Sequence, residues 1–235
     1  MSNIAAASDL NEVKVIDGDG DVLLVIGATK QSLRVSSRAL SVSPVFKSML
    51  GPHFREGQQP RSTAGPVPIL LPEDNYDGTR VMCQMLHLLK VESDEEHGSN
   101  CIYDYRAAAV TMKKYQVLDI FHYHLVGVLY EWLYDYPEED AIDVVIEAVV
   151  LAYLLDCNEA FEKATAQLIK NCYDGTMTLL GTSVIDLLPA SSLLILEERR
   201  AAAQNKRLRP GTEALCLQCT KQGTQDRYET CTIDH

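Results

Sequence analysis

The sequence predicts an α+β fold, with a small mixed sheet of short strands and helices followed by an α-helical C-terminal region. β-branched runs cluster in the first third of the 235 residues, and helical periodicity fills the rest. Strands and helices that are segregated along a chain indicate the α+β class, because doubly wound α/β proteins alternate them. A hydrophobic content of 46% and a charged content of 23% are typical of a globular protein rather than a disordered one.

Three short strands are expected before the first helices. "EVKVID" (12–17) and "DVLLVIG" (21–27) are rich in β-branched residues, and "GDG" between them supplies turn residues for a hairpin or a bent long strand. "QSLRVSS" (31–37) continues with the alternation of a half-buried strand. A further apolar strand, "VPILLPE" (67–73), follows a segment rich in Gly and Pro (51–68) that predicts a surface loop.

Two short helices are expected between the third strand and this loop. The stretch "LRVSSRALSVSPVFKSML" (33–50) changes from the period of a strand to that of a helix. Ser36 or Ser37 is the expected cap of the first helix. Ser43 followed by Pro44 predicts the start of the second, with a cap residue and then proline at the first helical position.

Helical patterns fill most of the remaining sequence. "DNYDGTRVMCQMLHLLK" has an apolar helical face, and Asp74 is its expected N-cap. Residues 103–116 and 118–133 predict a helical hairpin. Residues 141–156 form the most apolar segment, but it is shorter than the ~20 residues of a membrane-spanning helix and contains acidic residues. We therefore expect this segment to be a buried helix.

These elements divide the chain into four segments. They are an N-terminal segment (1–20), a compact domain (21–133), a helical C-terminal extension (141–209) and a polar tail (210–235). The tail is expected to be loosely ordered, because it is polar and lies at a terminus.

Composition narrows the classes of partner and compartment. A formal charge of −12 argues against nucleic-acid binding, because phosphate has to be neutralised by a basic surface. The first residues, "MSNIAAASDL", lack the basic start and apolar core of a secretory signal. Seven scattered cysteines, an odd number, indicate reduced thiols. We expect a cytoplasmic or nuclear protein that binds neither nucleic acid nor membranes.

The sequence contains none of the common catalytic or cofactor-binding motifs, so we expect no enzyme activity and no cofactor. The sequence contains no G-x-S-x-G, no H-E-x-x-H, no P-loop and no G-x-G-x-x-G. "DGDGD" (17–21) begins like a calcium loop, but Val22 and Ala28 occupy the positions that require Gly and Glu. A solvated turn before a strand is the expected structure of this segment.

One cysteine-rich set remains as a weak metal candidate. In "CLQC", Cys216 and Cys219 have the spacing of zinc ligands, and Cys231 and His235 could complete a set of four. Cysteines that bind no metal are the alternative, because the spacing of the last two residues is irregular for zinc fingers. A redox role is less favoured, because the thioredoxin-type C-x-x-C lies in a βαβ unit.

The order of the expected elements resembles a BTB/POZ domain. "DVLLVIG", "SLRVSSRALSVSPVFKSML", a loop, "ILLPED" and an amphipathic helix follow one another as in that family. The resemblance covers about Asp21 to Trp132, and the later "LAYLLDCNEAF" and "LEERRAAAQ" are similar to the helices that follow the domain in a group of fungal proteins. It implies a protein–protein interaction module, often homodimeric, with no catalytic residue.

The resemblance implies a surface for self-association. Ala39, Leu40 and Val42 are the hypothetical dimer interface, so that another copy of the chain is the expected partner. Phe46 and Leu50 lie on the same helical stretch and are expected to pack mainly inside the domain.

It also implies an alternative function as a substrate-adaptor subunit of a cullin-based ubiquitin ligase. Adaptors in the family carry a hydrophobic-x-Glu motif after the second short helix, and "MLGPHFRE" places Phe54 and Glu56 at this position. An exposed aromatic side chain would anchor a cullin and the carboxylate would orient it. A Phe that packs back onto the domain beside a surface Glu would give the same letters. A third alternative is a zinc- or thiol-dependent regulator that uses the C-terminal cysteine set.

Overall fold

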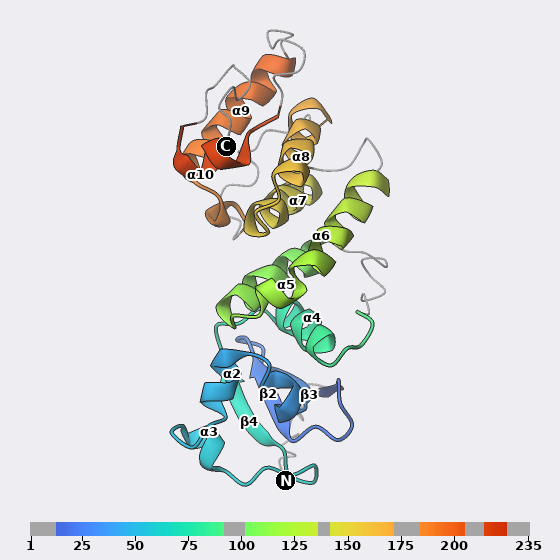
Figure 1. Cartoon of the computed structure of the whole chain (residues 1–235), viewed down its shortest axis with the longest axis vertical. Helices are drawn as coiled ribbons and strands as arrows, with labels where there is room; N and C mark the ends of the chain where they lie inside the picture. Colours follow the sequence, from blue (N-terminus) through green and yellow to red (C-terminus); the bar gives the residue numbers. More distant parts are fainter. Residues whose placement is uncertain (1–12, 92–101, 136–141, 172–183, 205–213, 225–235) are drawn as a thin grey trace, which may run out of the picture. The chain divides into compact units, whose positions relative to one another are not determined.

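The structure, a computed structural model, describes the chain in five ranges, which are 13–91, 102–135, 142–171, 184–204 and 214–224 (Figure 1). It divides into two compact units. The first contains the described residues up to 91 together with Thr111–Val117, and the second contains the others. The expected α+β class with a small mixed sheet is confirmed.

The sheet has four strands in the order β1-β3-β2-β4 (Figure 1). β2 (Val22–Ile26) pairs antiparallel with β3 (Gln31–Val35) and parallel with β4 (Val67–Leu71). β1 (Val13–Val15) pairs parallel with the outer side of β3. The tight turn in this sheet is therefore the one between β2 and β3, where Gly27 has a φ of 70°.

Residues 12–17 and 21–27 were expected to form a hairpin or a bent long strand, and both alternatives are wrong, because β1 and β2 are separate strands on opposite sides of β3. The "GDG" turn instead crosses the end of β3. Asp17 and Gly20 form the turn, and a Cβ on Gly20 would lie 2.7 Å from the carbonyl oxygen of Val35. Arg34 holds the crossing by donating from Nε to the Gly20 carbonyl at 3.0 Å. Glycine at position 20 is thus needed for close approach to the neighbouring strand.

Alternating side chains build the core of the first unit. The inward residues of β2 are fully buried, as are most of those of β3, and β4 alternates between buried and exposed. Burial of each such aliphatic side chain contributes about 1.5–3 kcal/mol. The helices of this unit are α1 (Ser37–Leu40), α2 (Pro44–Met49), α3 (Arg55–Gln58) and α4 (Tyr76–Leu86).

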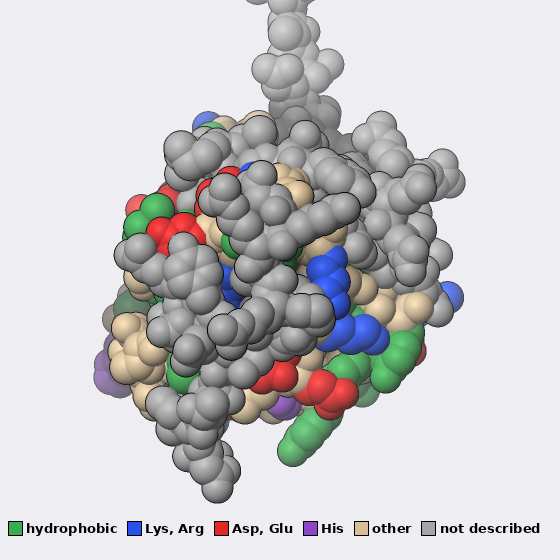
Figure 2. All heavy atoms as spheres, turned by 90° about the horizontal axis from the view of Figure 1, so that it is seen from above, with side chains coloured by type: hydrophobic (Ala, Val, Ile, Leu, Met, Phe, Trp, Pro, Cys, Tyr) green, Lys and Arg blue, Asp and Glu red, His purple; other side chains and the backbone are tan. Residues whose placement is uncertain are grey.

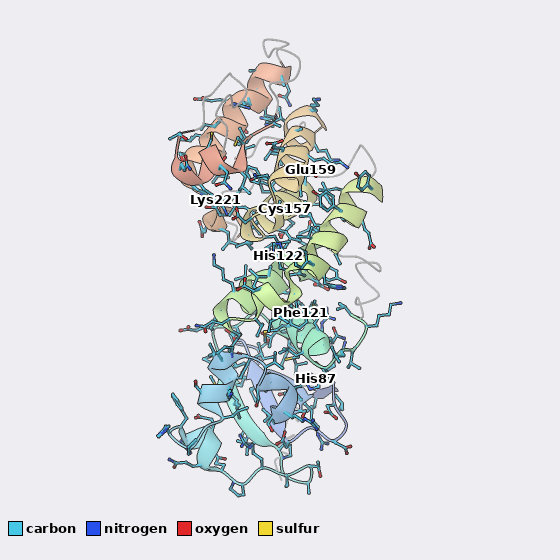
Figure 3. All side chains as sticks on the ribbon, in the orientation of Figure 1. His87, Phe121, His122, Cys157, Glu159 and Lys221 are labelled. Carbon is cyan, nitrogen blue, oxygen red and sulfur yellow. The ribbon has the colours of Figure 1, made fainter. Side chains whose placement is uncertain are left out.

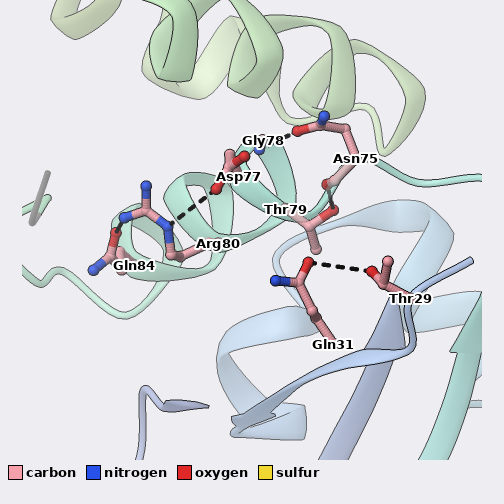
Figure 4. Close-up of polar contacts among 8 residues, drawn as sticks. All are labelled: Thr29, Gln31, Asn75, Asp77, Gly78, Thr79, Arg80 and Gln84. Atoms are coloured by element: carbon pink, nitrogen blue, oxygen red, sulfur yellow. Dashed lines mark hydrogen bonds and ion pairs between the residues drawn. The ribbon is translucent and has the colours of Figure 1, made fainter. Parts of the chain in front are cut away.

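Two details of these helices differ from expectation. The expected loop at 51–68 contains α3, a single helical turn that contacts β4. The N-cap of α4 is Asn75 rather than Asp74: Asn75 Oδ1 accepts from the Gly78 amide at 2.8 Å (Figure 4). The Thr79 hydroxyl donates to the Asn75 carbonyl at 2.7 Å, which closes the first turn.

The Asp74 side chain makes other hydrogen bonds, which explains why it does not cap α4. Its buried carboxylate accepts from Lys114 Nζ and from the Tyr115 hydroxyl. Tyr115 also stacks on Phe46, with ring centroids 4.2 Å apart and planes inclined by 6°. These contacts attach the end of α5 (Ile102–Lys114) and the residues after it to the sheet unit. A contact across forty positions of sequence leaves no local pattern.

The second unit is helical in its described part. It contains α6 (Leu118–Asp135), α7 (Ile142–Leu154), α8 (Asn158–Asn171), a 3₁₀ turn η2 (Ile185–Leu187), α9 (Ala190–Gln204) and α10 (Leu217–Gln222). α7 packs against α6 and α8, and α8 also contacts α9 and α10. Within the described ranges, no helix has both the length and the apolar character needed to cross a bilayer.

The expected buried helix at 141–156 is confirmed in α7, whose residues 145–152 are all buried. Glu147, the charged residue among 145–152, receives a two-pronged contact from Arg106, with N–O distances of 2.5 and 3.3 Å. This pairing is what permits a carboxylate at that depth, because an unpaired buried charge is very costly.

The expectation of a loosely ordered tail at 210–235 is wrong for residues 214–224. Leu215 and Leu217 are fully buried, and the Leu215 amide donates to Thr165 Oγ1 at 3.1 Å. Buried leucines in a polar segment anchor α10 on α8. Residues 225–235, with Cys231 and His235, lie outside the described ranges.

Candidate protein-interaction surface

The α1–α3 face, which we define as residues 37–58, holds both surfaces that the sequence singled out. Val42 and Phe54 are 48% and 49% exposed, whereas most large hydrophobic side chains of this unit are buried. Ala39 and Glu56 are partly exposed. Leu40 is fully buried, so its assignment to the dimer interface is corrected: the side chain faces the core where α1 meets α4.

Ser36 is the N-cap of α1, but its side chain makes no capping hydrogen bond. Side chains of two other residues hold the start of this helix instead. Asp21, just before β2, accepts from the Ser37 amide and the Ser37 hydroxyl, both at 2.7 Å. The imidazole Nε2 of His87 accepts from the Ser36 amide at 3.0 Å. The open amides of this short helix are thus satisfied by side chains that are distant in sequence.

The electrostatics of Asp21 follow from these contacts. Partial burial raises the pKa of its carboxyl, but the two hydrogen bonds from Ser37 and the nearby Arg61 charge outweigh burial, so that the pKa is lowered overall.

The contacts of His87 define its tautomer. Nδ1 lies 2.7 Å from the Cys83 carbonyl and must donate to it, which leaves Nε2 as the acceptor.

The second short helix begins as the sequence predicts. Ser43 is the N-cap of α2 and its hydroxyl accepts from the Phe46 amide at 3.2 Å, with Pro44 in the first turn. The same hydroxyl donates to the Tyr115 carbonyl at 2.7 Å. The predicted burial of Phe46 and Leu50 is confirmed, with 0% and 6% exposed.

Backbone contacts fix the position of Phe54. A Cβ on Gly57 would lie 1.8 Å from the Gly51 carbonyl oxygen, so that only glycine allows α3 to approach the end of α2. The Phe54 amide donates to the Gly51 carbonyl at 3.3 Å, and the Phe54 carbonyl accepts from Gly57 and Gln58. Gln58 Nε2 also donates to the Pro52 carbonyl at 3.1 Å. The main chain around Phe54 is therefore held on both sides.

The side chains of Phe54 and Glu56 lie at the start of α3. Phe54 occupies the N-cap position with an extended backbone, and Glu56 lies in the first turn, where a carboxylate is favourable. Phe54 does not pack back into the core, which was the alternative that its sequence left open. This geometry presents an apolar ring next to a negatively charged residue on a fixed loop.

The C-terminal cysteine set is only partly described. Cys216 is half-buried at the N-cap of α10 and Cys219 is buried within it. In the described ranges, no three His, Cys, Asp or Glu side chains gather as a metal-binding group. Cys83 is fully buried in the other unit, and burial raises the pKa of its thiol to about 12.

Sequence reasoning missed the residues that support the α1–α3 face. Asp21 and His87 lie 16 and 51 positions away from the residues they hold, and no local pattern marks either as a cap. Gly57 offered a weak signal, because a glycine inside a helical turn usually has a packing reason. In the view of Figure 2, basic, acidic and hydrophobic side chains are interspersed among the described residues.

A comparison with protein-family models found no match, and a search of curated proteins found no significant match either.

Proposed function

We propose that this chain is a protein–protein interaction module of the BTB/POZ type, which associates with a second copy of itself and acts by binding rather than by catalysis. The observed order of two paired strands, two short helices, a third strand and an amphipathic helix supports the proposal, since it follows the order in the resembling family. Cytoplasm or nucleus is the proposed compartment.

The observation that carries this proposal is the exposure of apolar side chains on a well-held face. Val42 and Phe54 project from segments that the Ser43 cap of α2 and the backbone contacts around α3 hold in place, so their exposure is a property of the folded state. Exposed apolar residues on rigid elements are suited to become binding anchors, because little conformational entropy is lost on association.

Self-association is tested by light scattering on matched variants. Val42→Glu places a charge in the proposed dimer interface and should convert the dimer to a monomer. Leu70→Glu is the control, because Leu70 is 72% exposed on β4 of the same unit and lies outside the α1–α3 face. A dimer that survives Val42→Glu but not Leu70→Glu would place the interface on the sheet instead.

The second candidate is a substrate adaptor for a cullin-based ubiquitin ligase, which the arrangement of Phe54 and Glu56 on α3 favours. The test is binding of a BTB-binding cullin fragment to the purified chain. Phe54→Ala and Glu56→Lys should each abolish binding, whereas the controls Leu70→Ala and Glu73→Lys, at exposed positions on β4 and just after it, should not. Unchanged binding by the two α3 variants would exclude this use of the motif.

A further inference from the structure

Two cysteines lie at the start of helix α10, and neither forms a disulfide in the structure. Cys216 is the N-cap, with φ −79° and ψ 124°, and Cys219 lies one turn further along. Their accessibility differs: Cys216 is half-buried, while Cys219 is only 2% exposed. The pair therefore combines a partly exposed cysteine with a buried one.

The backbone places the two residues at the separation of a disulfide. The distance between their Cα atoms depends on the torsions of Leu217 and Gln218, which are helical, and helical geometry gives about 5 Å. Disulfide-bonded cysteines have Cα atoms about 4.4–6.8 Å apart. The Thr220 amide donates to the Cys216 carbonyl at 2.9 Å, which closes the turn. The extended backbone at an N-cap also directs its side chain toward the third helical residue, which here is Cys219.

Contacts on both sides of the pair hold this turn in place. Before it, the Leu215 amide donates to Thr165 Oγ1 and Arg199 donates to the Ala214 carbonyl. After it, Lys221 pairs with Asp156, and its ammonium group lies 5.2 Å from the centre of the Tyr153 ring. Figure 3 shows Lys221 on α10, and Cys157 and Glu159 at the start of α8. A thiol pair on a docked turn is preorganised for intramolecular reaction.

We propose that Cys216 and Cys219 form a reversible dithiol–disulfide site that exchanges with low-molecular-weight disulfides of the glutathione class. The Cys216 thiolate attacks one sulfur of the small disulfide, which gives a mixed disulfide and releases one small thiol. The Cys219 thiolate then attacks the Cys216 sulfur and releases the second small thiol. Two protein thiols are oxidised, one small disulfide is reduced to two thiols, and the two protons of the protein thiols pass to the leaving thiolates.

The site is independent of the proposed interaction function, because α10 belongs to the second unit and the α1–α3 face to the first. It also differs from the zinc alternative in its chemistry. A bound zinc ion would hold both sulfurs as thiolates and protect them from exchange.

The test uses the full-length chain, purified reduced and then incubated with oxidised glutathione. Remaining thiols are alkylated, and tryptic peptides are analysed by mass spectrometry. Residues 208–221 form one tryptic peptide, since the Arg209–Pro210 bond resists cleavage, and its only cysteines are Cys216 and Cys219. We expect this peptide to be unalkylated and lighter by two hydrogen atoms, and to recover both thiols after treatment with dithiothreitol.

Two single variants separate the roles of the thiols. Cys219→Ser should accumulate a mixed disulfide of glutathione at Cys216, because the resolving thiol is missing. Cys216→Ser should leave Cys219 largely unmodified, because that thiol is buried. Cys157→Ser is the matched control, a half-buried cysteine of the same unit, and should leave the disulfide yield unchanged.

The following results would overturn the proposal. They are an alkylated 208–221 peptide after oxidation, equal glutathionylation of the two single variants, or stoichiometric zinc that blocks exchange in the purified chain. Oxidation that joins Cys216 to Cys157 or Cys231 would likewise contradict it.

Discussion

Helices α3 and α10 are both short and both carry residues on which a proposal rests, but they are held in different ways. Around α3 the contacts are mainly between backbone groups, from the close approach of Gly57 to Gly51 to the bonds at the Phe54 carbonyl. Around α10 they come from side chains of other helices and loops, namely Thr165, Arg199 and Asp156. Contacts between backbone groups depend on glycines within the same segment, whereas contacts from side chains depend on residues far away in sequence.

The largest effect is expected at Gly57, where the backbone of α3 lies very close to the Gly51 carbonyl. Gly57→Ala puts a Cβ into the Gly51 carbonyl, and we expect it to reduce the free energy of unfolding by about 3 kcal/mol, as for severe overpacking. Chemical denaturation of the two proteins measures the difference. Gly18→Ala is the control, because a Cβ there has no atom within 4 Å and should change little. Equal stability of both variants would mean that position 57 has room for a Cβ beside the Gly51 carbonyl.

A smaller loss is expected at Arg199, which is fully buried and donates to the Ala214 carbonyl ahead of α10. Arg199→Ala should cost about 2 kcal/mol, because the carbonyl loses a charged donor. The loss should appear as faster amide hydrogen exchange in 214–224, with 13–91 unaffected. Exchange that rises equally in both regions would show that Arg199 supports the whole chain rather than α10.

Asp21 offers a pH-dependent test of the first unit. Its lowered pKa means that it stabilises the fold above the ordinary pKa of a carboxyl, and that this contribution is lost as the pH falls through the lowered value. Asp21→Ala removes both bonds to Ser37 and should cost about 1 kcal/mol near neutral pH, in the range of a lost cap. The difference from wild type should shrink as the pH falls below the ordinary pKa of a carboxyl. A difference that stays constant with pH would contradict the assigned role of the carboxylate.

The smallest effect is expected at Lys221, whose ion pair with Asp156 is largely exposed. Lys221→Ala should change the free energy of unfolding by less than about 0.5 kcal/mol, since surface ion pairs contribute little. Thermal unfolding at low and high salt checks this. A loss as large as that of Arg199→Ala would mean that Lys221 is a principal anchor of α10.

The contrast between local and distant contacts also explains what the sequence could predict. Ser43 with Pro44, the β-branched run of β2 and the apolar run of α7 are local signals, and each predicted its element correctly. The hairpin or bent strand predicted around "GDG" was wrong because β1 pairs with β3, a partner about twenty positions away in sequence.

In the candidate site, too, local signals in the sequence were predictive and distant contacts were not. Phe54 was singled out because "MLGPHFRE" resembles a motif of BTB/POZ adaptors, and the sequence left open whether its side chain is exposed, as the structure shows. Asp74 was assigned to a cap because of its position, but a tertiary contact with Tyr115 takes its carboxylate, and Asn75 caps α4 instead. Leu40 was assigned to a surface because α1 is too short to show which of its faces is buried.

The most direct test of the central claim is the solution mass of the full-length chain, measured by light scattering over a range of concentrations. An interaction module that self-associates through the α1–α3 face predicts a dimer of the 26.1-kDa chain, and a monomer after Val42→Glu. A wild-type chain that stays monomeric at every concentration would contradict the claim.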